Sequence, residues 1–149
     1  MNNKKGFTLI ELIVILALAS IVMLAVMSFF IANYRSYNML NTESELQYQS
    51  QNIINFMTDK ILETKEFEGK DADDEYSFIN DDGTKLTFKK ENGKLVFKEE
   101  DEPEVTVGDY IEEFDITSLN DKEVSITLKL EKDNIAVDAE QTVFMRNAQ

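Results

Sequence analysis

The sequence predicts an α+β protein, in which one long N-terminal helix precedes an antiparallel β-sheet head. Neither Gly nor Pro, the residues that most often interrupt helices, occurs between Gly6 and Gly69. Beyond residue 66, turn residues and alternating apolar residues become frequent, which is typical of antiparallel strands. The charge changes at the same place, because residues 1–65 carry no net charge and the whole net charge of −14 falls on residues 66–149. A chain of 149 residues with this pattern indicates one domain with a helical extension.

The first part of the predicted helix, residues 7–32, is almost entirely apolar. The polar exceptions are Thr8, Glu11, Ser20 and Ser28. At about 1.5 Å per residue, the segment is long enough to cross a bilayer core of ~30 Å. Lys4 and Lys5 precede it, and the positive-inside rule then predicts a cytoplasmic N-terminus and an acidic head outside.

A removable secretory signal is an alternative interpretation of this segment. Residues 17–19, Ala-Leu-Ala, have the small-x-small form of a cleavage site. Cleavage there would leave the apolar run 21–32 at the new N-terminus, which disfavours this alternative.

Glu11 is the residue that a simple membrane anchor does not explain. A carboxylate in an apolar helix costs about 2.5–3.5 kcal/mol at the bilayer centre, and such a residue usually marks a partner. The alternative is that Glu11 lies shallow enough to reach the lipid headgroups.

The second part of the helix, residues 33–65, is amphipathic and is expected to pack against the acidic head. Its apolar residues recur at spacings of three and four, namely Tyr34, Tyr37, Leu40, Ile54, Met57 and Ile61. We expect the tyrosines, Tyr48 included, to fill core and interface positions. The glutamine-rich residues 47–52 predict a polar stretch of helix that faces another subunit.

The head is expected to contain a sheet of four to seven strands. Residues 123–130 alternate strictly, with apolar residues at even positions, and Asp133-Asn134 then offers a turn to a partner strand over 135–145. A second hairpin is predicted from residues 86–90 and 94–98 around Asn92-Gly93. Residues 76–79 and 111–116 predict two further strands.

The composition argues against an enzyme. His and Cys are both absent, which excludes His-based triads, Cys nucleophiles, disulfides and the usual zinc sites. The net charge of −14 argues against nucleic-acid binding through a basic face. The acidic runs 71–75 and 99–104 offer oxygen ligands for calcium, but neither has the spacing of an EF-hand, so we expect no metal and no cofactor.

The N-terminal run 4–13, Lys-Lys-Gly-Phe-Thr-Leu-Ile-Glu-Leu-Ile, resembles the signal of type IV prepilins and the related pseudopilins. The resemblance lies in a short basic leader that ends in Gly, followed by Phe, Thr, Leu, an aliphatic residue, Glu and Leu at the start of an apolar helix. It implies that prepilin peptidase, a membrane aspartyl protease, cleaves between Gly6 and Phe7 and methylates the new amine of Phe7. Glu11 then occupies the position at which the family uses a Glu to meet the terminal amine of a neighbouring subunit, since two charges in an apolar environment cost less as a pair.

The resemblance also implies an organisation of the whole chain. The expected parts are a leader (1–6), a transmembrane and filament-core helix (7–32), an amphipathic helix packed on the head (33–65) and an acidic β-rich head (66–149). The expected partners are prepilin peptidase, membrane lipid, the pilus assembly platform in the membrane, and other major and minor pilins. The protein would reside in the cytoplasmic membrane and then in an extracellular filament.

Within this family, the order of features most resembles a minor pilin of the J or W type. Such minor pilins resemble filament initiators, which prime polymerisation of the major pilin and remain near the tip. A competence or type II-like secretion pseudopilin would share every motif, and an unprocessed single-span surface protein would share the helix but not the cleavage. The pseudopilin and the unprocessed surface protein are therefore two alternative interpretations.

Overall fold

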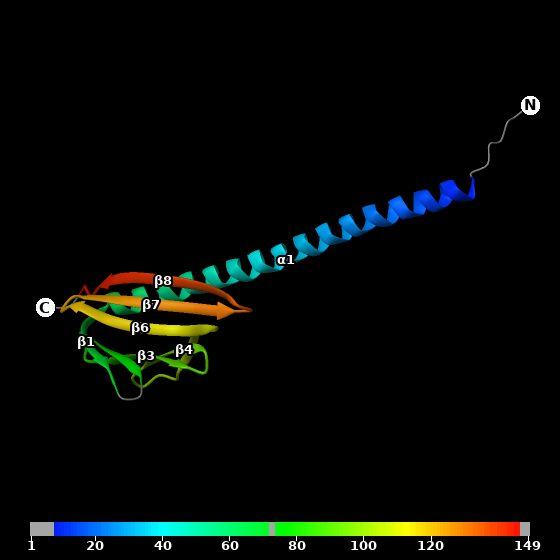
Figure 1. Ribbon diagram of the computed structural model, residues 1–149. Helices are drawn as coiled ribbons and strands as arrows, with labels where there is room; N and C mark the ends of the chain where they lie inside the picture. The colour runs from blue at the N-terminus through cyan, green and yellow to red at the C-terminus, as the bar shows by residue number, and fades with distance from the viewer. Residues whose placement is uncertain (1–7, 72–73, 147–149) are drawn as a thin grey trace, which may run out of the picture. The chain divides into compact units, whose positions relative to one another are not determined.

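The computed structural model describes residues 8–71 and 74–146. The chain consists of two compact units, Met1–Leu40 and Asn41–Gln149. A single helix, α1 (Leu9–Leu62), contributes to both, and eight antiparallel strands belong to the second (Figure 1). The predicted α+β class is confirmed.

Three polar side chains in the first unit's part of α1 bond to the helix itself. The hydroxyls of Ser20 and Ser28 donate to the carbonyls of Leu16 and Leu24 at 2.8 and 2.9 Å. The amide of Asn33 donates in the same way, to a carbonyl four residues earlier, at 2.8 Å. Each bond uses the i−4 carbonyl, so these residues sit in an apolar helix without an unpaired hydroxyl or amide.

The last five turns of α1 bury one stripe of side chains. Its members are Leu46, Ser50, Ile53, Met57 and Ile61. The expected stripe was wrong in its first half, because Tyr34, Tyr37 and Leu40 are all exposed. The expectation that Tyr48 fills a core position is also wrong, since this side chain is 70% exposed. The buried stripe is broken by Ser50 and bordered by Glu and Gln, so its apolar spacing is hard to recognise in the sequence.

The first sheet is a five-stranded meander in chain order. Its strands are β1 (Thr64–Lys70), β2 (Glu75–Asn80), β3 (Lys85–Glu91), β4 (Lys94–Glu99) and β5 (Val105–Gly108). The predicted hairpin at Asn92-Gly93 is confirmed, and both turn residues have positive φ, 51° and 73°. This is the geometry of a type I′ turn, which Asn-Gly adopts readily.

The second sheet contains β6 (Ile111–Asn120), β7 (Glu123–Lys132) and β8 (Ile135–Phe144) in that order. The alternation predicted for β7 is confirmed, since Val124, Ile126, Leu128 and Leu130 are all fully buried. The turn at Asp133-Asn134 is confirmed as well, again with two positive φ angles, 54° and 61°.

The strand count and the single sheet were wrong. Eight strands form two sheets rather than one sheet of four to seven, and the sequence pattern missed β1 and β5. In β1, Phe67 is the only large apolar residue among charged neighbours, and β5 has only four residues, so neither shows a readable period. The helix ends at Leu62 and β1 begins at Thr64, so residues 64–65 are strand rather than the end of a helix running to 65.

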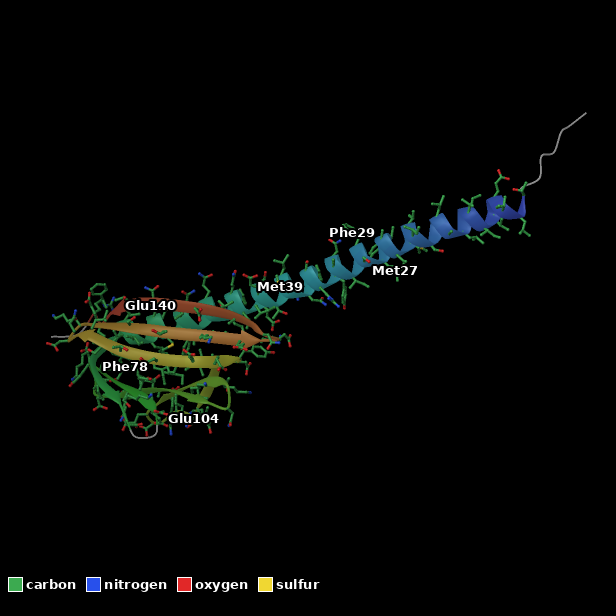
Figure 2. All side chains as sticks on the ribbon, viewed as in Figure 1. Met27, Phe29, Met39, Phe78, Glu104 and Glu140 are labelled. Atoms are coloured by element: carbon green, nitrogen blue, oxygen red, sulfur yellow. The ribbon has the colours of Figure 1, made fainter. Side chains whose placement is uncertain are left out.

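The buried stripe of α1 and both sheets share one core. Phe88 lies at its centre, with its ring centroid 6.1 Å from that of Phe78 and 5.1 Å from that of Phe97. Figure 2 shows Phe78 inside this unit. Polar bonds also join the layers, because Tyr76 donates to Asp115 at 2.5 Å and Lys132 binds Glu45 at 2.8 Å. The helix and the two sheets of this unit are therefore held as one packed body.

Candidate functional site

The start of α1 holds the one predicted site residue that the structure describes, Glu11. Thr8 donates to Glu11 Oε2 twice, from its backbone N–H at 3.1 Å and from its hydroxyl at 3.0 Å. In return, the backbone N–H of Glu11 donates to Thr8 Oγ1 at 3.3 Å. This reciprocal arrangement is a capping box, which satisfies backbone donors that a helix N-terminus otherwise leaves unpaired.

The capping box changes the electrostatic account of Glu11. Its carboxylate lies in the first turn of α1, where the helix dipole favours negative charge. The two bonds that reach the carboxylate both end on Oε2. Among the described residues no donor contacts Oε1, which leaves that oxygen able to accept a bond from another chain. The carboxylate is thus partly compensated within its own chain.

The leader residues Lys4, Lys5 and Gly6, and Phe7 after the predicted cleavage site, lie outside the described residues. The structure therefore does not test the predicted cleavage between Gly6 and Phe7 or the methylation of Phe7, and both remain predictions from the sequence. The spacing Thr8-x-x-Glu11 is itself a sequence signal for a capping box, so this role of Glu11 could have been predicted from the sequence.

The helix that follows Glu11 presents apolar side chains around its whole surface. Phe29 and Phe30 are 67% and 65% exposed, and Figure 2 shows Met27, Phe29 and Met39 projecting from α1. Among the described residues, α1 is the one helix long and apolar enough to cross a membrane. So much exposed apolar surface is unfavourable in water, and it indicates an environment of lipid or of other apolar helices.

The acidic residues of the head serve turns and ion pairs. Asp82 accepts the backbone N–H of Thr84 at 2.9 Å, and this bond holds the pKa of Asp82 below its usual value. Glu104 and Glu99 pair with Lys89 and Lys60, at 3.2 and 3.3 Å. In the described part of the chain, no three acidic side chains converge on a point where a metal ion could bind.

Comparison with known proteins agrees with the N-terminal pattern. Residues 1–27 match a family model described as the prokaryotic N-terminal methylation motif. Gly6, Phe7 and Glu11 all fall within the matched residues. No curated protein and no solved structure matches the chain. In this chain the motif occurs together with a pilin-like fold of a long apolar helix and antiparallel sheets.

Proposed function

We propose that this chain is a minor pilin of a type IV pilus that helps to initiate filament assembly and stays at or near the tip. The observation that supports this most directly is the methylation motif over residues 1–27, placed at the start of an exposed apolar helix. Prepilin peptidase removes residues 1–6 and methylates the amine of Phe7. The mature helix then moves from lipid into a bundle of pilin helices.

Glu11 provides the polar contact of that bundle. Before assembly, Thr8 and the helix N-terminus compensate the carboxylate through Oε2. On assembly, Glu11 Oε1 accepts a hydrogen bond from the methylated amine of Phe7 in a neighbouring subunit. A charge pair buried among apolar helices is costly unless both charges are matched, so a subunit in the wrong axial register is rejected.

The membrane orientation follows from the leader. Lys4 and Lys5 hold the N-terminus in the cytoplasm, where prepilin peptidase acts, and the acidic head lies outside. From lipid, the subunit passes to the assembly platform in the membrane and then joins major and minor pilins in the filament.

The charge of the head supports a subunit present in few copies. The charged residues of the segment 1–40 are Lys4, Lys5, Arg35 and Glu11, which give it a net charge of +2. Since the whole chain has a net charge of −14, residues 41–149 carry a net charge of −16. Heads of this charge repel one another when packed side by side. The strand pattern after Asn92-Gly93 is the other support for a J- or W-type minor pilin.

A competence or secretion pseudopilin remains the second candidate, because it would share the motif and the helix. The identity of the major subunit that copurifies with the chain separates the two. An unprocessed surface anchor, the third candidate, would retain Met1 and the leader.

The decisive measurement is the mass of the N-terminus, in membranes and in sheared filaments of cells that contain prepilin peptidase. We expect N-methyl-Phe7 in both fractions, and loss of cleavage in Gly6→Glu, because a bulky charged side chain blocks a narrow membrane-edge site. Gly6→Ala serves as the control and should be partly cleaved. Deletion of the gene should reduce the number of filaments while leaving their major subunit unchanged. An intact Met1 in wild-type cells would contradict the proposal.

A further inference from the structure

A groove of about 550 Å³ separates α1 from β8 in the second unit. Gln47, Gln51 and Asn55 line it from the helix, together with Ser50 and Ile54, and residues 137–141 of β8 form the opposite wall. Figure 1 shows β8 running beside this part of α1. The groove is remote from Glu11 in sequence and has no part in the proposed assembly through the apolar helix.

The two walls match in length and in hydrogen-bonding capacity. Gln47, Gln51 and Asn55 lie at i, i+4 and i+8, so they share one helix face over about 12 Å. On the opposite wall, residues 137–141 of β8 extend over about 14 Å. β8 is the last strand of its sheet and pairs only with β7, so its other edge presents backbone N–H and C=O groups. Side-chain amides face this edge, and they both donate and accept hydrogen bonds.

Carboxylates border the same edge on the outer face of the sheet. Asp138 and Glu140 pair in register with Lys129 and Thr127, which lie on the face of β7 opposite its buried even-numbered residues. Glu140 accepts the hydroxyl of Ser125 at 3.2 Å, also on that face, and Figure 2 shows Glu140 projecting from β8.

Negative charge predominates at this edge. Lys129 is the cation opposite Asp138, and it also binds Glu113 at 3.4 Å. Lys129 therefore faces two carboxylates, those of Glu113 and Asp138, while Glu140 lies opposite the uncharged Thr127. Strand edges that carry charge of one sign select partners of the other sign.

We propose that the edge of β8 binds an extended basic segment of a different polypeptide, which adds as a fourth strand beside β8. The alternation of a strand gives that segment two faces. Its Lys or Arg residues lie on the outer face next to Asp138 and Glu140. Its small or β-branched residues point into the groove, against Val137, Ala139 and the amides of α1.

The charge of this chain identifies the partner as a different polypeptide. The second unit carries a net charge of −16, so two copies repel each other at this edge. The lysine-rich strands β3 and β4 each have a neighbour on both sides in their own sheet, so neither can reach the groove of a second copy without unfolding.

The test uses the full chain in nanodiscs of phosphatidylcholine and a labelled short peptide that alternates Val and Lys, followed by fluorescence anisotropy. We expect saturable binding that weakens in high salt. A peptide with Glu in place of Lys should not bind. The Lys peptide methylated at every backbone nitrogen should not bind either, because neither of its edges can then donate to the ladder. Equal binding of the methylated peptide would overturn the proposal in favour of simple charge attraction.

Two pairs of variants test the position of the site. Asp138→Lys with Glu140→Lys should weaken binding about tenfold, since two favourable cross-strand pairs become repulsive. The matched control, Asp81→Lys with Glu102→Lys, changes the net charge equally on exposed residues elsewhere and should have an effect of less than about twofold. Gln51→Trp fills the groove and should block binding, whereas Asn52→Trp, which does not line the groove, should not.

Absence of binding, or equal loss in both charge variants, would overturn the proposal. If the carboxylates serve only to protect an open edge, the peptide will not bind, and a variant that removes their charge, Asp138→Val with Glu140→Val, will self-associate. Circular dichroism of every variant should match that of the wild type, so that any loss reflects the edge itself.

Discussion

Thr8 and Glu11 form their capping box within one subunit, and this separates two roles of the Glu11 side chain. One role is to accept hydrogen bonds at the start of α1, which any side chain with an acceptor oxygen can fulfil. The other, which belongs to the proposed function, is to bring a negative charge to a neighbouring amine, and this requires the carboxylate. The resemblance of residues 4–13 to prepilin signals implied the second role. The spacing Thr8-x-x-Glu11 indicates the capping role, but only the structure gives the lengths of the hydrogen bonds.

Substitution of Glu11 can test the two roles apart. Glu11→Gln keeps the cap but removes the charge, and Glu11→Ala removes both. Both variants should insert and be cleaved normally, and both should enter filaments at least about tenfold less than the wild type at matched membrane levels. First-turn amides should exchange about fivefold faster in Glu11→Ala than in Glu11→Gln, because loss of a cap costs ~1 kcal/mol. Normal incorporation of Glu11→Gln would show that the charge is not needed.

Tyr76 and Asp115 link the two sheets through a bond that depends on pH. The Tyr76 hydroxyl lowers the pKa of Asp115, whereas burial, followed by the bond to Asp115, raises the pKa of Tyr76. A lowered Asp pKa stabilises the fold above the unfolded value of about 3.9, and this stabilisation is lost as pH falls further. A raised Tyr pKa stabilises the fold below about pH 10, and this stabilisation is lost as pH rises above it.

Tyr76→Phe should therefore cost about 1 kcal/mol of unfolding free energy at pH 7. The difference from the wild type should shrink below pH 4 and above pH 10. Urea denaturation across this pH range checks the expectation, with Thr117→Val as a control that removes only the second bond to Asp115. A difference that stays constant with pH would show that lost packing, rather than the hydrogen bond, explains the effect.

At the scale of elements, strands were predictable where burial follows a period of two. β7 buries every even-numbered residue from 124 to 130, so its sequence alone shows which of its faces lies against the core. β1 and β5 form because neighbouring strands supply their hydrogen bonds, and the information for them lies in β2 and β4. The division into two sheets depends on the path of the chain near Tyr110, whose φ is 62°, and no sequence pattern signals this.

The end of β5 depends on a close approach to α1. A Cβ atom at Gly108 would lie 2.7 Å from Ile53 Cγ1 and would also collide with Cδ1 of that fully buried side chain. We expect Gly108→Ala to destabilise the second unit by about 1–3 kcal/mol, since overpacking displaces neighbours.

A double-mutant cycle with Ile53→Ala tests this contact by thermal denaturation. Ile53→Ala alone should cost about 2–5 kcal/mol because it leaves a cavity. In its presence Gly108→Ala should cost much less, as the added methyl group has room. Additive losses would mean that Gly108 is needed for another reason.

At the scale of the whole chain, the shared core explains why α1 cannot be separated from the sheets it covers. A fragment of residues 41–149 keeps the buried stripe and should be soluble, monomeric and folded. A fragment of residues 64–149 lacks the stripe, exposes the apolar faces of both sheets and should aggregate despite its acidic charge. Circular dichroism, thermal melting and size-exclusion chromatography distinguish the two. A well-folded 64–149 fragment would contradict a core shared by the helix and the sheets.

The internal hydrogen bonds of Ser20, Ser28 and Asn33 have a mechanical consequence. Helices yield under tension where proline has removed a backbone hydrogen bond or where glycine leaves the backbone more flexible. Between Leu9 and Leu40 this helix contains neither residue, and the side chains of Ser20, Ser28 and Asn33 bind carbonyls one turn earlier. A pulling force along this segment therefore meets an unbroken ladder of backbone bonds, so in the filament that we propose, extension should begin by sliding between neighbouring helices before the helix itself unwinds.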